Sequence, residues 1–234
     1  MTGRPLMALL GLGALLAISR GGPILADDIT ELLAPYLQAR DAHQVGEVTV
    51  RALGDPSRPT APPIPYQGVS VLLFPYSVPF DSEIDDVKAH FRDSLRNYMG
   101  AVADVVAART GYESALVWGG GGELVRGEVS DAQGLARLTE IPGGEWVLLA
   151  WREESHPGKA PLLKGRETKG FRDIPLSTGY SVVTYWWMRL QVRAGETTAL
   201  ELNDRNVWMA GIREDLIYMQ GLPATKIGPR RRGY

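Results

Sequence analysis

The chain has 234 residues, of which 44% are hydrophobic and 22% are charged, a composition typical of a folded globular protein. Its 25 basic and 27 acidic side chains give a formal charge of −2, so nucleic acid is not expected to be a partner. The chain contains no cysteine, which excludes disulfides, thiolate metal sites and cysteine nucleophiles.

The first segment of the chain has the pattern of an export signal. Arg4 lies in a short N-terminal region, and an uncharged apolar run from Leu6 to Ile18 follows it. This run is short for a bilayer-spanning helix, which needs about 20 residues. We expect residues 1–26 to be a signal peptide, cleaved at its end or after Ser19, with no stable membrane span after cleavage. The mature protein is then periplasmic or secreted; a retained anchor or a buried helix is the alternative.

The segment that follows is expected to change from helix to strand. Residues 27–44 carry apolar side chains at helical spacing and predict a lead-in helix, with a kink or break at Pro35. From Val45 the hydrophobic period becomes two, which predicts strands over residues 45–52 and 68–75. The proline-rich segment between these two strands is expected to be a loop.

One amphipathic helix is predicted over residues 81–110. Asp81 or Ser82 is the candidate N-cap, and acidic side chains fill the first turn, where the helix dipole favours negative charge. Gly111 is the candidate C-terminal stop. The apolar positions, which recur at spacings of three and four, are Ile84, Val87, Phe91, Leu95, Tyr98, Val102, Val105 and Val106.

The second half of the chain has a strand pattern. The predicted strands are 124–129, 135–141, 145–151, 180–192 and 197–202, with a further strand or short helix over 208–218. A long loop is expected over residues 155–179 and a basic tail over 219–234. Short strands separated by turns are typical of a sandwich. The fold predicted for residues 45–218 is therefore a mainly β, antiparallel β-sandwich with an inserted amphipathic helix.

Two turns in this region carry a resemblance to a known family. In the turn Asp131–Gly134, Gly134 stands where positive φ is needed, and Pro142 presets φ in the turn before the strand that begins near Trp146. In this order and spacing the two turns resemble those of the carboxypeptidase regulatory-like domains and of the Cna-B-like and transthyretin-like sandwiches.

Two further segments are similar to the same family, the opening segment 65–73 and the closing hairpin 192–202. The resemblance covers about half of the mature chain. It implies an Ig-like sandwich that serves folding support, adhesion or ligand contact, and it implies no active site.

Neither a catalytic constellation nor a metal site is predicted. The three histidines, His43, His90 and His156, are not at metal-ligand spacing, and no cofactor is expected. The Gly-x-Ser-x-Gly motif of serine hydrolases does not occur. We therefore predict that the protein is not an enzyme. A hydrolase with acidic residues along the 155–179 loop is kept as a further alternative.

An aromatic cluster on the 180–192 strand gives the strongest positive signal for binding. Strand alternation places Tyr185, Trp187 and Arg189 on one face and Trp186 and Met188 on the other. One face must belong to the core. The other face is either exposed, where it would stack on a sugar ring or dock a partner, or covered by the inserted helix.

Two functional hypotheses follow from these features. The first is an exported, non-catalytic module for interaction with an unidentified protein or surface. The second is a module that binds a carbohydrate or another small ligand through Tyr185, Trp187 and Arg189, with Trp151 and Trp208 as additional candidates.

Overall fold

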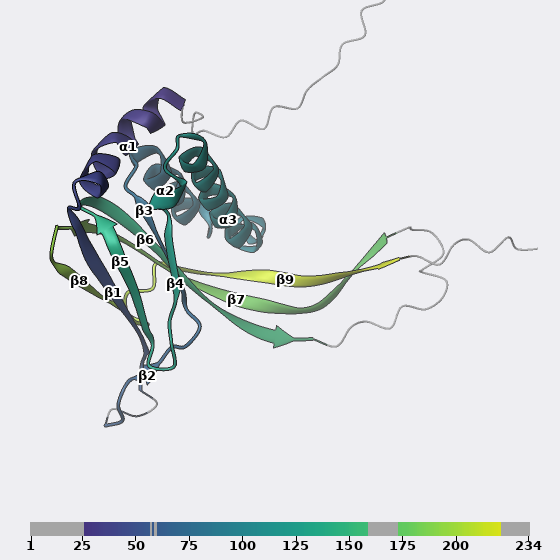
Figure 1. Ribbon diagram of the computed structural model, residues 1–234. Coiled ribbons are helices and arrows are strands. Elements are labelled where there is room, and N and C mark those ends of the chain that lie inside the picture. Colours follow the sequence, from purple (N-terminus) through teal and green to yellow (C-terminus); the bar gives the residue numbers. More distant parts are fainter. Residues whose placement is uncertain (1–25, 57, 59, 159–172, 221–234) are drawn as a thin grey trace, which may run out of the picture.

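The protein is a β-sandwich that carries an additional layer of helices on one of its two sheets (Figure 1). The computed structural model describes residues 26–56, 58, 60–158 and 173–220. The expected signal peptide, apart from its last residue, lies outside the described residues, as does most of the expected basic tail. The predicted mainly β, antiparallel sandwich fold with a helical insertion is confirmed.

The first sheet is built around one central strand. Its members are β1 (Val45–Gly54), β2 (Ile64–Pro65), β5 (Leu135–Pro142) and β8 (Thr197–Leu202). Strand β1 runs antiparallel to β2 and β5 and parallel to β8. Val48, Val50 and Ala52 of β1 are buried, because the period-two pattern turns them towards the core.

The second sheet has five strands in the order β4-β3-β6-β7-β9. They are β4 (Arg126–Val129), β3 (Ser70–Pro75), β6 (Gly144–Pro157), β7 (Asp173–Val192) and β9 (Met209–Gln220). The last three are long, and they continue past the sandwich as a twisted extension, which we call the arm (Figure 1). The arm begins beyond Trp151, Tyr185 and Met209, which lie side by side in the sheet register.

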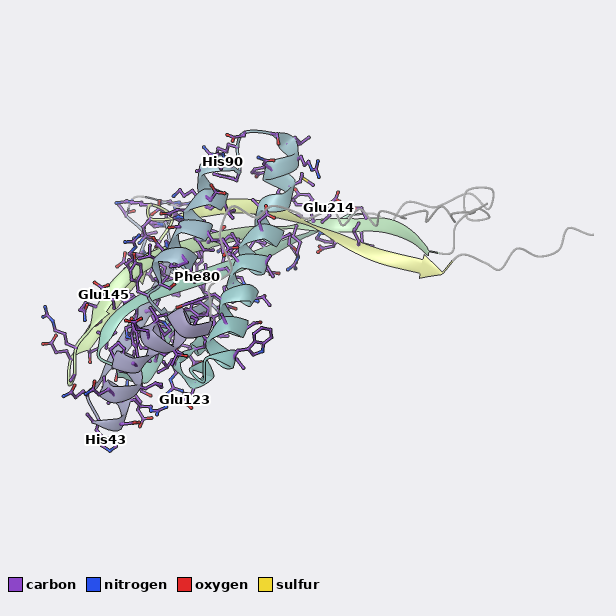
Figure 2. All side chains as sticks on the ribbon, turned by 90° about the horizontal axis from the view of Figure 1, so that it is seen from above. His43, Phe80, His90, Glu123, Glu145 and Glu214 are labelled. Atoms are coloured by element: carbon purple, nitrogen blue, oxygen red, sulfur yellow. The ribbon has the colours of Figure 1, made fainter. Side chains whose placement is uncertain are left out.

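The helices are α1 (Ala26–Asp41), α2 (Val78–His90) and α3 (Leu95–Trp118), followed by a short 3-10 turn (Gly122–Leu124). Seen from above, they lie over one face of the second sheet (Figure 2). Within the sandwich both faces of β6 are consequently covered, and Val147, Leu148, Leu149 and Ala150 have no exposed surface.

The insertion between β3 and β4 differs from the single helix predicted over 81–110. The chain turns at residues 91–94, and Ser94 caps a second helix by accepting a hydrogen bond from the Asn97 backbone N–H at 3.1 Å. At the start of α2, Ser77 takes the N-cap position in place of Asp81 or Ser82. Asp81 is instead buried against the sheet.

The insertion also extends further than predicted, because Gly111 does not end the helix. A glycine inside a helix costs about 1 kcal/mol relative to alanine. Burial of Tyr112 and Leu116 in the following turn offsets this cost, and α3 ends only at Gly119. Of the predicted apolar stripe, Leu95 and Val106 are exposed, by 76% and 41%.

Aromatic rings attach the insertion to the second sheet. Phe80 of α2 stacks on Tyr112 of α3 with ring centroids 4.3 Å apart, and its edge meets Phe74 of β3 at 5.6 Å. The Tyr112 hydroxyl donates to the carbonyl oxygen of Pro75 at 2.9 Å. Tyr112 is desolvated by this packing, which raises the pKa of its phenol. The insertion is therefore an integral layer of the core.

The predicted loop over residues 155–179 differs from the structure. Strand β6 continues to Pro157 and β7 begins at Asp173, so the segment predicted as the loop 155–179 is strand at both ends. Of the strand or short helix predicted over residues 208–218, the structure shows the strand, which continues to Gln220. The reason is long-range pairing: the ends of β6 and β9 are both held by β7, which the local hydrophobic pattern does not reveal.

The turn at Gly134 brings its backbone close to that of Ala52 on β1. Gly134 has φ +74°, and an added Cβ would lie 2.3 Å from the Ala52 carbonyl oxygen. Gly195 has nearly the same φ, +73°, with no atom within 4 Å of the corresponding position. We predict that Gly195→Ala costs about 1 kcal/mol from backbone strain alone. Gly134→Ala should cost about 2–3 kcal/mol, because the clash also disrupts backbone hydrogen bonds.

Urea unfolding of both variants measures this difference. Equal destabilisation by the two substitutions would show that positive φ, and not the close approach to Ala52, determines the requirement for glycine.

Candidate functional site

The helices divide the predicted aromatic face into a covered and an accessible group. Tyr185 is only 3% exposed. Trp151, its neighbour on β6, is half-buried, and the Arg109 guanidinium of α3 lies 5.2 Å from the centre of its ring. Tyr185 therefore has no free ring face for a ligand, as the hypothesis of a covering helix had anticipated.

Trp187, Arg189 and Trp208 form the accessible group along the flank of α2. Trp187 and Trp208 are half-buried, with ring centroids 6.4 Å apart. The Lys88 ammonium lies 5.1 Å from the centre of the Trp208 ring, and the edge of Phe80 meets Trp187 at 5.4 Å. Three of the five candidate residues are thus brought together by the structure.

Arg189 is held in place by a buried carboxylate. Its Nε donates to Asp81 Oδ1 at 3.0 Å, and a terminal nitrogen donates to Oδ2. The Asp81 side chain is 7% exposed and that of Arg189 is 56% exposed. Hydrogen bonding to Asp81 is the main cause that raises the pKa of Arg189. The guanidinium is therefore fixed on one side and open to solvent on the other.

Two adjoining clefts, with volumes of about 330 and 470 Å³, lie near this arginine, which lines the first of them. They share Tyr76 and Glu145. The first cleft is also lined by Trp146, Arg189, Leu190 and Gln191, and the second by Glu31, Leu32, Pro35 and Tyr36 of α1. We call the two clefts together the tyrosine–arginine groove. Glu145 lies at the edge of the molecule in Figure 2, away from the arm.

The groove has a rigid lining. Tyr36 donates its hydroxyl to the Glu145 carbonyl oxygen, and its ring meets the buried Trp146 edge-on at 5.2 Å. Burial raises the pKa of Tyr36 to about 12. The Tyr76 ring lies 4.8 Å from the guanidinium of Arg189.

The groove combines hydrogen-bond donors, acceptors and an aromatic ring. A guanidinium has five N–H donors, and Arg189 uses two of them on Asp81. Glu145 contributes a carboxylate and Gln191 an amide, which both donates and accepts. Such a set suits a ligand that carries several hydroxyl groups.

Sequence reasoning found Arg189 but missed Tyr76, Glu145 and Gln191. Extending the alternation of residues 185, 187 and 189 by one step would have reached Gln191. Tyr76 and Glu145 are joined by long-range pairing, since the Tyr76 N–H donates to the Glu145 carbonyl at 3.0 Å, and no local pattern indicates this.

The sequence predicts neither a metal site at the histidines nor a membrane span in the mature chain. In the part of the chain that the structure describes, no group of three or more histidine, aspartate or glutamate side chains is arranged to hold a metal ion. His90 contacts Asp93 at 2.8 Å, and His156 stacks on Tyr180 at 4.9 Å. None of the described helices has the length and apolar character needed to span a bilayer.

Comparison with known proteins gives distant likenesses only. No protein-family model and no curated protein matches the sequence. A candidate carbohydrate-binding protein from Pseudomonas aeruginosa is 12% identical with a TM-score of 0.35, over 68% of this chain and 88% of that one. The minor pilin of Streptococcus agalactiae is 11% identical with a TM-score of 0.25, over 77% of this chain and all of the pilin.

The pilus backbone protein of Streptococcus pneumoniae is a further distant likeness. It is 14% identical with a TM-score of 0.25, over 67% of this chain and 40% of the pilin. Likenesses this weak assign no family, so the resemblance to carboxypeptidase regulatory-like domains remains a hypothesis.

The Asp81–Arg189 pair makes a testable contribution to stability. Arg189→Leu leaves the buried Asp81 carboxylate with a single hydrogen-bond donor among the described residues, the Trp187 Nε1–H at 3.4 Å. We predict a thermal midpoint several degrees below that of the wild type, because an unsatisfied buried carboxylate is costly. The double variant Asp81→Leu/Arg189→Leu should recover part of this loss, since neither charge remains. A double variant less stable than Arg189→Leu would contradict the pairing.

Burial of Tyr185 predicts a loss of stability at high pH. Desolvation raises its pKa to about 12, from an ordinary value of 10. The unfolded chain releases the phenol proton near pH 10, whereas the folded chain keeps it until about pH 12. The contribution of the protonated, buried Tyr185 to the free energy of unfolding is therefore complete below pH 10 and is lost as the pH rises through 12. We expect the free energy of unfolding to fall by up to about 1.4 kcal/mol per pH unit from this residue.

Urea unfolding of Tyr185→Phe between pH 8 and 11 should show a shallower decline than the wild type. Tyr180→Phe, which removes a 44% exposed tyrosine of the arm, is the matched control and should leave the slope unchanged. Identical slopes for Tyr185→Phe and the wild type would contradict the burial of this phenol.

Proposed function

We propose that the protein is an exported, non-catalytic β-sandwich module that binds a saccharide in the tyrosine–arginine groove. One observation carries the proposal: a guanidinium fixed by a buried carboxylate lies against an aromatic ring where two clefts meet. A fixed polar group loses little conformational entropy when a ligand binds, and this favours affinity.

The chemistry of the groove favours a neutral polyhydroxylated ligand over an anion. The charge of Arg189 is balanced by Asp81, and two further carboxylates, Glu31 and Glu145, line the clefts. A negatively charged ligand would be repelled by these carboxylates. Sugar hydroxyl groups both donate and accept hydrogen bonds, so they match the guanidinium, the carboxylates and the Gln191 amide together.

Trp187 and Trp208 extend this surface along α2. They continue from Arg189 towards Lys88, and each is half-buried, so each is held by packing and retains some accessible ring surface. Aromatic rings provide an apolar contact area for the CH groups of sugar rings. A linear oligosaccharide that occupies the groove would therefore reach the two tryptophans with its next units.

Export rests on the sequence pattern of residues 1–26, and the absence of catalysis rests on the lack of a recognised constellation. The specific alternative is hydrolysis, since Glu31 and Glu145 both line the second cleft. Glycosidases use a pair of carboxyl groups on opposite sides of the scissile bond. Analysis of the bound oligosaccharide after incubation distinguishes the two, because a binding module returns it uncleaved.

The binding test is a glycan array followed by calorimetric titration of the best ligand. We expect Tyr76→Ala and Gln191→Ala each to weaken binding about tenfold, which corresponds to about 1.4 kcal/mol. The matched control is Tyr180→Ala, which removes an exposed aromatic side chain from the arm and should leave the affinity unchanged. Equal affinity for the wild type and both groove variants would contradict the proposed site.

A further inference from the structure

An open sheet edge lies on the arm, remote from the groove. Strand β9 is the last strand in the order of the second sheet, and within the described residues it pairs with β7 alone. The paired length runs from Met209 to Gln220. The outer edge of such a strand presents backbone N–H and C=O groups that can pair with another strand.

The α2–α3 hairpin projects over the space beside this edge. An added Cβ on Gly211 would lie 2.8 Å from the Val102 side chain, so α3 crosses β9 at this glycine. The part of α3 from Leu95 to Val102 is about 10 Å long, which is more than the spacing of about 4.8 Å between neighbouring strands. The start of α3 can therefore extend beyond the outer edge of β9. In Figure 2 the end of α2 that carries His90 extends past β9. Leu95 and Met99, near this end, are 76% and 38% exposed.

We propose that β9 pairs antiparallel with β9 of a second copy of this chain, about a twofold axis at Glu214. This register places Arg213 of each copy opposite Asp215 of the other, on the face that carries the helices. Within one copy both terminal nitrogens of Arg213 donate to Glu153 of β6, at 2.9 and 2.8 Å, and Asp215 Oδ2 accepts from the Ser181 hydroxyl at 3.4 Å. Each terminal nitrogen of a guanidinium carries a second N–H, so Arg213 can bridge Glu153 of its own copy and Asp215 of the other. On the opposite face it places Ile212 opposite Leu216. Opposite charges and apolar side chains that face each other across strands stabilise a sheet.

Charge complementarity selects this register over its neighbours. An axis at Arg213 would place the two copies of Arg213 opposite each other, and an axis at Asp215 would do the same for Asp215. Neither of these registers places opposite charges opposite one another. The axis at Glu214 creates two Arg–Asp pairs and only one like-charged pair, between the two copies of Glu214.

The helices leave room for this arrangement. Gly211, where α3 crosses β9, would face position 217 of the second copy. The two crossings are then six residues apart along the strand, or about 20 Å. Because a helix with its side chains is about 10–12 Å wide, the two copies of α3 would lie beside each other without collision. Helix α2, whose Lys88 contacts Trp208, lies on the side of α3 that faces away from the axis. Each hairpin would cover the added strand of the other copy and reduce the exposure of Leu95 and Met99.

Sedimentation equilibrium of the full chain tests the proposal. We expect a dimer. Asp215→Arg creates two like-charged pairs with Arg213 of the other copy and should weaken the dimer about tenfold or more. The exchange variant Arg213→Asp/Asp215→Arg restores opposite charges between the copies. It also places a new carboxylate at position 213 beside Glu153, which pairs with Arg213 in the wild type, so it is combined with Glu153→Gln and should then recover most of the affinity. Glu214→Gln removes the one repulsive pair and should tighten the dimer several-fold.

The matched control is Glu128→Arg, on β4 at the opposite edge of the same sheet, which should leave the dimer unchanged. If the Asp215 variants do not fold, Glu214→Gln still tests the register, because Glu214 is an exposed side chain. A chain that remains monomeric at about 1 mM would overturn the proposal. So would a dimer whose affinity is unchanged in both Asp215→Arg and Glu214→Gln.

Discussion

The packing of Phe74, Phe80 and Tyr112 joins the helical insertion to the second sheet, and most other features of the molecule depend on it. These rings bring α2 and α3 onto the face of β6 and β7 that a two-layer sandwich would leave to solvent. The central strands are therefore buried on both faces. The same contact covers Tyr185, carries Asp81 to Arg189 and sets where α3 crosses β9.

The insertion thereby determines which parts of the aromatic strand remain available to a ligand. Only the residues along the flank of α2 and at the start of β6 remain accessible, and Arg189 is fixed there by a carboxylate that the sheet alone would not supply. In the proposed site Arg189 is fixed before a ligand binds, which suits the proposed recognition of a polyhydroxylated molecule. Most of the arm is not covered by α3, so the outer edge of β9 is accessible for the proposed pairing with a second copy.

The hydrophobic period was sufficient to predict the sandwich, the bounds of β8 and the turn at Gly134, because these depend on local spacing and on the conformational freedom of glycine. It did not reveal the break between α2 and α3. The helical spacing of apolar residues continues from Phe91 to Leu95 without interruption, so it gives no sign of the turn between the two helices. That turn is determined by the Ser94 cap. Alternation predicted the shared face of Tyr185, Trp187 and Arg189, but only tertiary packing decides which of them is covered. Tyr76 and Glu145 come together through pairing between distant strands.

Hydrogen–deuterium exchange of the free protein tests most directly whether the insertion is an integral layer of the core. The account predicts that amides of α2 and α3 exchange as slowly as those of β6 and β7 within the sandwich, because opening the helices would expose both Phe80 and the outer face of the sheet. Fast exchange throughout α2 and α3, with β6 and β7 still protected, would show that the insertion opens independently. That result would contradict the account.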